Sequence, residues 1–164
     1  MRNISVCLAL VSSLMFCVSQ PLLVDICKAY GMKQDTAQHF TAEIITECTL
    51  FNIDPETIFF LAIAETGLKN IYGDNGDAVG YFQLHKEVVW FVKERYQLKN
   101  VPKNHKDLIN NVDLQIQIAV RYFHYLLAKY GSKEAALKHW NGSDGFVKYY
   151  NEVASYINRL FKKD

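Results

Sequence analysis

The sequence has almost no surplus of charge, because 18 Lys and Arg stand against 17 Asp and Glu in 164 residues. Binding to nucleic-acid phosphates needs an excess of basic residues, so this balance argues against a nucleic-acid partner. Proline is also scarce, with three residues, and the chain has no repeats, charge blocks or low-complexity linkers. Half of the residues are hydrophobic, which together with the length predicts a single folded domain.

Motifs for metals and phosphates are missing as well. The five histidines include no pair spaced at i, i+4, and the cysteines form no Cys-x-x-Cys unit. The glycine-containing stretch 73–80 lacks the lysine and the following Ser or Thr of a phosphate-binding loop, and the sequence has no nucleophile elbow. We therefore expect neither a metal ion nor a cofactor.

The first 19 residues have the pattern of a secretory signal. Arg2 is followed by an apolar run from about Ile4 to Val18, and small or polar residues come next. A retained membrane anchor is the alternative, but a span needs about 20 apolar residues and this run has no basic flank after it. We predict cleavage after Ser19 and a single mature domain, residues 20–164, that is periplasmic or secreted. Loss of Arg2 leaves 17 basic and 17 acidic residues.

Two cysteines remain after removal of the predicted signal, Cys27 and Cys48. An even number of cysteines in an exported protein is consistent with a disulfide between them. The alternative is a pair of buried thiols that never meet, and sequence does not supply the geometry that would decide.

The mature chain is predicted to be mostly α-helical, because apolar residues recur at helical spacing in most segments. Asp54 as N-cap, Pro55 at the first helical position and Gly67 after the last turn mark one helix clearly. Residues 78–84 are the only candidate for a short strand. The helices are expected at Thr41–Phe51, Pro55–Thr66, Glu87–Gln97, Asp113–Tyr130, Lys133–His139 and Gly145–Phe161.

Glu65 is the most unusual residue of this pattern. It lies near the end of an apolar helix and shares a face with Ile58, Leu61 and Ala62 at i, i+3, i+4, i+7 spacing. Burial and the negative end of the helix dipole both raise the pKa of such a carboxyl group. A protonated glutamic acid near neutral pH can donate a proton to a glycosidic oxygen. A side chain that simply reaches water at the helix end is the alternative.

Three segments in order resemble motifs of the lytic transglycosylases and goose-type lysozymes of the lysozyme-like superfamily. That group has Glu-Ser at the end of a buried helix, then Gly-Leu-Met-Gln, then an Ala-Tyr-Asn-like segment. The counterparts here are AET at 64–66, GYFQ at 80–83 and HWNG at 139–142, and the resemblance covers roughly residues 41–157. Thr66 replaces the serine, Tyr81 and Phe82 replace leucine and methionine, and Trp140 replaces the tyrosine.

The resemblance implies a mostly α lysozyme-like domain that cleaves the MurNAc-GlcNAc bond of peptidoglycan, with Glu65 as catalytic acid and then base. In lytic transglycosylases the muramyl 6-hydroxyl closes a 1,6-anhydro ring, so one carboxylate suffices. The residues implied to bind substrate are Thr66, Gly80, Tyr81, Gln83, Trp140, Asn141 and Tyr149. The expected partner is the glycan strand, with an envelope-spanning machine as a further partner by family analogy, and the enzyme is expected to be a monomer.

Two other functions stay open at this point. A hydrolytic lysozyme would use a second carboxylate, for which Asp74 and Asp77 are the candidates, although Asp beside Gly is also ordinary turn chemistry. An exported glycan-binding protein without turnover is the other. A pure binder gains nothing from a desolvated acid at Glu65, which favours the enzyme.

Overall fold

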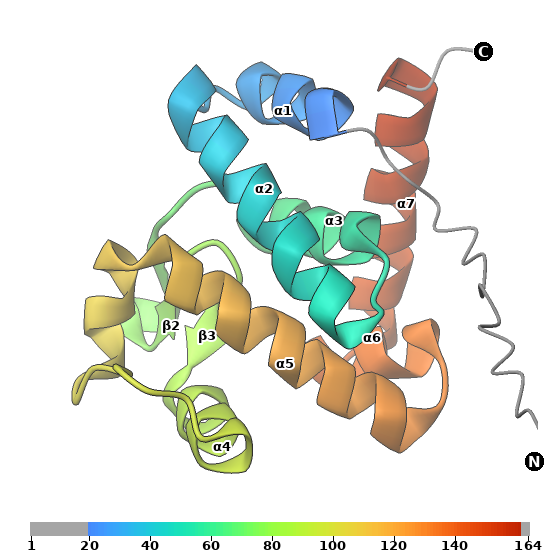
Figure 1. The fold of residues 1–164 in the computed structure, drawn as a ribbon. Helices are drawn as coiled ribbons and strands as arrows, with labels where there is room; N and C mark the ends of the chain where they lie inside the picture. The colour runs from blue at the N-terminus through green and yellow to red at the C-terminus, as the bar shows by residue number, and fades with distance from the viewer. Residues whose placement is uncertain (1–19, 162–164) are drawn as a thin grey trace, which may run out of the picture.

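The computed structural model describes residues 20–161, so the predicted signal at residues 1–19 lies outside the described part of the chain. No helix within residues 20–161 has the length and apolar character needed to cross a membrane. The fold is mostly α-helical with one small antiparallel sheet (Figure 1). Its elements are α1 (Gln20–Ala29), α2 (Gln34–Phe51), α3 (Pro55–Thr66), β1 (Tyr72–Gly73), β2 (Ala78–Val79), β3 (Leu84–His85), α4 (Lys86–Tyr96), α5 (Val112–Tyr130), α6 (Lys133–Asn141) and α7 (Asp144–Phe161), with short 3-10 turns at Asp74–Gly76 and His105–Asn110.

Helix α3 is buried and forms the centre of the fold. Its residues 57–63 are all buried, as expected for a helix that is apolar on every side. The Asp54 side chain accepts a hydrogen bond from the Glu56 N–H (3.1 Å), and Gly67 ends the helix in the left-handed conformation (φ 60°). The predicted caps are therefore confirmed. Packing of α3 against α2 and α7 fixes the position of its last turn, which carries Glu65.

Helices α2 and α5 lie across each other and cover the core (Figure 1). The helix predicted at Asp113–Tyr130 is confirmed as α5, and its residues Ile116, Ala119, Val120 and Phe123 are fully buried. Helix α2 begins at Gln34, earlier than the predicted Thr41. Its first turns are mostly polar, so they show little of the apolar spacing on which the prediction of a helix relied. Helix α1 was not predicted, although its apolar residues Leu23, Val24, Ile26 and Cys27 are buried at helical spacing.

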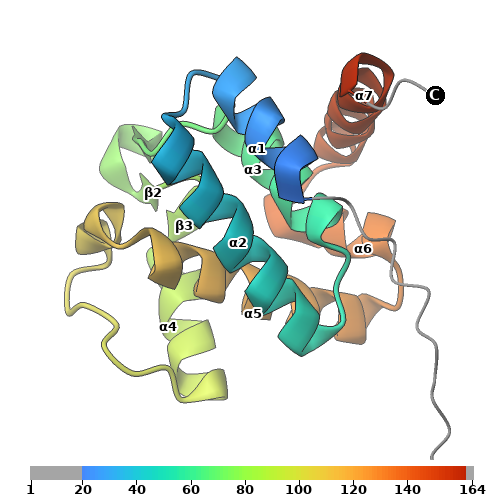
Figure 2. The ribbon, with the colours of Figure 1, turned by 45° about the horizontal axis from the view of Figure 1, so that its top comes forward.

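The sheet lies beside α4, at the opposite end of the molecule from α7 (Figure 2). Its order is β1-β2-β3, with Tyr72 opposite Val79 and Val79 opposite Leu84. The single strand expected over 78–84 is therefore two strands joined by a turn. Gly80 (φ 81°) and Gln83 (φ 48°) have left-handed backbone conformations that interrupt the extended chain.

Cys27 and Cys48 are buried in the core as free thiols, so the disulfide considered between them is not formed in the structure. Burial raises the pKa of the Cys27 thiol to about 12, and burial also raises the pKa of Cys48. Both cysteines therefore act as small apolar core residues here.

Candidate active site

Glu65 opens into a polar cavity of about 430 Å³ between the end of α3, the sheet and the end of α6. The elements that form it are separated along the sequence. Helices α3 and α6 both pack on α7, and the Thr66 hydroxyl joins the end of α3 to the turn between β2 and β3. The residues that line the cavity are Glu65, Asp74, Gln83, His85, Trp140 and Asn141.

The carboxyl group of Glu65 is held by the indole of Trp140. The Trp140 Nε1–H donates a hydrogen bond to Glu65 Oε1 over 2.9 Å, and the Trp140 ring packs against Tyr122 and Phe123 at centroid distances of 5.4 Å and 6.4 Å. These ring contacts restrict the indole to the orientation in which its single donor meets the carboxyl. Trp140 is therefore fixed in position to orient Glu65.

Burial raises the pKa of Glu65 from its ordinary 4.5 to about 7. Hydrogen bonds from Trp140 and Asn141 oppose this rise because they stabilise the carboxylate, whereas the negative charge of Asp74 adds to it. The predicted pKa rise of this residue is thus supported by its surroundings. Near neutral pH, Glu65 exchanges between the acid and base forms, as a group that first donates and then accepts a proton must.

Asp74 and His85 line the same cavity as Glu65 and lie next to each other. The Asp74 Oδ2 and His85 Nε2 atoms are 3.2 Å apart, and both side chains are substantially exposed. Asp74 (φ 46°) and Asn75 (φ 57°) both have left-handed backbones, a sparsely populated conformation that concentrates at functional sites. His85 was missed in the sequence. No strand periodicity could have found it, because Gln83 (φ 48°) has a left-handed backbone and lies outside the strand Leu84–His85.

Asp77, the other candidate for a second carboxylate, does not line the cavity. Its Oδ1 is 3.9 Å from Lys106 Nζ, and its carbonyl oxygen is 3.1 Å from His105 Nε2. Asp77 therefore connects the loop after β1 to the 3-10 turn at His105–Asn110 through these two contacts.

The turn between β2 and β3 presents Gln83 to the cavity but turns its neighbours inward. Gln83 Nε2 donates to the Gly80 carbonyl oxygen (2.9 Å), while Tyr81 is buried and packs on Phe40 at a centroid distance of 4.7 Å. The buried amide of Gln115 accepts from the Tyr81 N–H (3.0 Å) and lies where a side chain on Gly80 would have to fit. Gly80 and Tyr81, expected at the groove, therefore form its support.

Thr66 and Tyr149 also lie outside the cavity lining. The Thr66 hydroxyl is 3.1 Å from the Tyr81 carbonyl oxygen and accepts a hydrogen bond from the Lys69 N–H (3.2 Å). It joins the end of α3 to the turn below the cavity. Tyr149 is half exposed on α7, and its neighbour Tyr150 is the buried residue, with its hydroxyl donating to the Thr57 carbonyl oxygen (3.3 Å).

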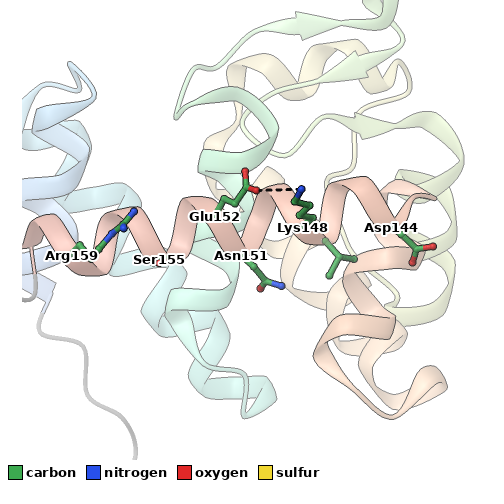
Figure 3. Close-up of a pocket in the computed structure, with 7 residues that line it drawn as sticks. Asp144, Lys148, Asn151, Glu152, Ser155 and Arg159 are labelled. Carbon is green, nitrogen blue, oxygen red and sulfur yellow. Dashed lines mark ion pairs between the residues drawn. The ribbon is translucent and has the colours of Figure 1, made fainter.

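A larger hollow, of about 590 Å³, runs along an exposed face of α7 (Figure 3). All of its lining residues belong to that helix, and Lys148 and Glu152 form an exposed ion pair at 4.0 Å. Exposed pairs of this kind contribute little energy. The face lacks the convergence of groups from several elements that marks the cavity at Glu65.

The described residues, 20–161, contain no cluster of three or more His, Cys, Asp and Glu side chains suited to a metal ion. The cavity instead offers one acid whose pKa is near neutrality, one exposed carboxylate and two hydrogen-bonding amides. This set suits proton transfer to and from a polar, uncharged substrate.

Comparison with known families agrees with this geometry. The transglycosylase SLT domain matches residues 43–158, which include every residue of the cavity. No curated protein matches the chain. A match over most of the chain, together with the helical fold and small sheet, shows that this protein belongs to the transglycosylase SLT family, the lysozyme-like lytic transglycosylases that cleave peptidoglycan.

Proposed function

We propose that this protein is a lytic transglycosylase that cleaves the β-1,4 bond between MurNAc and GlcNAc, with Glu65 as the general acid and base. The observation that carries the proposal is the placement of Glu65, which opens into a polar cavity while burial raises its pKa to about 7. A carboxyl group with that pKa is protonated in a useful fraction of molecules at neutral pH.

In the first step, protonated Glu65 donates its proton to the bridging oxygen as the bond from that oxygen to the muramyl C1 breaks. The ring then carries an oxocarbenium-like positive charge. The Glu65 carboxylate that remains is stabilised by the hydrogen bond from Trp140 Nε1–H. Asp74 supplies a second negative charge in the same cavity, and His85 holds it at 3.2 Å.

In the second step, the Glu65 carboxylate takes the proton of the muramyl 6-hydroxyl, and that oxygen forms a bond to C1. The products are a 1,6-anhydromuramyl end and a free GlcNAc hydroxyl, water is not consumed, and Glu65 is protonated again. Intramolecular attack favours this route because the nucleophile is already attached to the reacting ring. Gln83 and Asn141 line the cavity wall, and in this proposal their amides bind the acetamido groups of the substrate.

Hydrolysis is the second candidate. The observation that favours it is the placement of Asp74, which the sequence offered only as one of two candidates for a second carboxylate. Asp74 lines the same cavity as Glu65, so a water molecule between the sugar and this carboxylate could replace the 6-hydroxyl as nucleophile. The product would then carry a reducing end. The family match favours the anhydro product.

The proposal includes export. It rests on the signal-like pattern of residues 1–19, because a secretory signal directs the protein to the compartment that holds peptidoglycan. We further propose that the mature enzyme is a monomer and serves local opening of the wall for an envelope-spanning machine, by analogy with its family.

The test uses the exported protein, expected to begin at Gln20, with purified peptidoglycan and mass spectrometry of the released muropeptides. Wild type should give products one water lighter than reducing-end products, and Glu65→Gln should lower the rate at least about a hundredfold. Glu94→Gln, on the exposed face of α4, is the matched control and should keep the wild-type rate. Reducing-end products that disappear in Asp74→Asn would establish the hydrolase instead. Binding of glycans without release of products from any of them would rule out both the transglycosylase and the hydrolase.

A further inference from the structure

The cavity at Glu65 holds a second pair of titratable groups, Asp74 and His85, to which the proposed transglycosylase steps give no proton transfer. The Asp74 Oδ2 and His85 Nε2 atoms are 3.2 Å apart. Within residues 20–161, neither side chain forms another hydrogen bond or ion pair. Asp74 and His85 therefore pair with each other alone, at the wall of the catalytic cavity.

The register of the sheet brings the two residues together. Gly73 of β1 and His85 of β3 both lie opposite Ala78, on the two sides of β2, and Asp74 directly follows Gly73. His85 is also the N-cap of α4, where a side chain commonly accepts a hydrogen bond from the first backbone N–H groups of the helix. It forms no such bond, so its ring is left to meet Asp74.

The contact between an imidazole and a carboxylate prepares the imidazole to act as a base. A ring that donates its Nε2–H to a carboxylate keeps the other nitrogen, Nδ1, as a proton acceptor. The carboxylate fixes this tautomer and stabilises the imidazolium that forms when Nδ1 takes a proton. The exposed fractions are 45% for the His85 side chain and 70% for the Asp74 side chain, so water reaches the pair. The pair can therefore activate a water molecule.

The proposed transglycosylase route depends on a free 6-hydroxyl group, because that oxygen is the nucleophile. An acyl group on the oxygen removes the proton that Glu65 takes in the second step and prevents closure of the anhydro ring. Cleavage of an acylated strand needs a nucleophile from outside the sugar, which water supplies. A nucleophile attached to the reacting ring has the advantage over water whenever it is free. A water route would therefore show on strands whose 6-hydroxyl is blocked.

We propose that the cavity has a second, hydrolytic activity toward glycan strands whose muramyl 6-hydroxyl is acylated, with His85 as general base and Asp74 as the residue that positions it. Glu65 donates its proton to the bridging oxygen as the bond to the muramyl C1 breaks. His85 Nδ1 then takes a proton from water, and the water oxygen bonds to C1. The product is a reducing end that keeps its acyl group, and the proton on His85 returns through solvent to the Glu65 carboxylate. The inference rests on the proposed function for the glycan and for Glu65 as the acid.

The test digests one batch of 6-O-acetylated peptidoglycan, half of it deacetylated by mild alkali, with the exported protein and reads the products by mass spectrometry. Wild type should release reducing-end muropeptides that keep the acetyl group from the first half and anhydro products from the second. His85→Gln keeps a donor for Asp74 but takes no proton, so it should lower the ratio of acetylated reducing-end to anhydro products at least about a hundredfold. Asp74→Asn should lower the same ratio at least about tenfold, because an amide does not stabilise an imidazolium.

A second exposed His–Asp pair supplies the matched control. His39 Nε2 lies 2.6 Å from Asp113 Oδ1, between α2 and α5 and outside the cavity lining, so His39→Gln should leave the ratio unchanged. Loss of both kinds of product in equal measure in His85→Gln would show a structural role and overturn the proposal.

The two halves of the batch separate this proposal from the proposed function. If wild type releases no acetylated reducing ends but gives anhydro products from the deacetylated half, the water route is overturned and the transglycosylase stands. Acetylated reducing ends that depend on His85, without anhydro products from the deacetylated half, would support the water route and overturn the transglycosylase. Release of no product from either half would overturn both.

Discussion

Replacement of Glu65 by glutamine should change the pH dependence of stability in a way that follows from its burial. The folded protein holds the pKa of Glu65 at about 7, against 4.5 for an ordinary glutamate. At about 1.4 kcal/mol for each pKa unit, this difference corresponds to about 3 kcal/mol. Glutamine has nearly the same shape and no proton to release, so this contribution is absent from the variant.

The sign of the effect is set by which state holds the proton. Between pH 4.5 and about 7 the unfolded chain has released the Glu65 proton while the folded protein retains it. The free energy of unfolding of the wild type therefore falls as pH rises through this interval and levels off above it. Relative to wild type, Glu65→Gln should gain about 3 kcal/mol on going from pH 4 to pH 8.

Urea unfolding at a series of pH values, followed by far-UV circular dichroism, measures this difference directly. Circular dichroism is preferred to fluorescence because Trp140 touches Glu65 and its emission would report the protonation itself. Glu94→Gln, exposed on α4, is the control and should stay within about 0.5 kcal/mol of wild type at every pH. If the free energies of unfolding of Glu65→Gln and wild type differ by the same amount from pH 4 to 8, the pKa of Glu65 is not raised in the folded protein. That result would refute Glu65 as the proton donor near neutral pH.

Three further predictions concern the hydrogen bonds at and below the cavity and the two cysteines of the core. Trp140→Phe removes the donor that stabilises the Glu65 carboxylate, so the alkaline limb of the kcat profile, near pH 7 in wild type, should move up by about one unit in a pH-rate series. Gln115→Leu leaves buried partners unsatisfied below the cavity and should cost about 2 to 4 kcal/mol in thermal unfolding, whereas a loss under 0.5 kcal/mol would show that the amide is not needed. Cys27 and Cys48 should both resist a thiol reagent in the folded exported protein and both react in urea, and intact-mass measurement without reductant should find no disulfide.

The sequence by itself determined the elements whose signals are local. Asp54, Pro55 and Gly67 mark both ends of α3 because a capping side chain, a missing N–H and a left-handed glycine act within one turn of the helix. The caps of α5 and α6 are local in the same way, because Asn111 and Ser132 accept from backbone N–H groups three residues later. The same helical spacing predicted that Glu65 shares a face with apolar residues, but it left open whether the carboxyl is buried or reaches water, and burial in the folded protein is what raises its pKa.

The tertiary structure alone decided which side chains reach Glu65. Trp140 is 75 residues away in sequence, and its indole arrives there only because the packing of α6 on α5 places it against Tyr122. The motif residues Tyr81 and Gln83 illustrate the same point, since one is buried and the other faces the cavity. The spacing of residues in the sequence does not predict which of the two is buried. Gly80 and Gln83, at the two ends of the turn, have left-handed backbones, which break the alternation of a strand. Local rules thus placed the acid, and long-range packing supplied the partners that tune it.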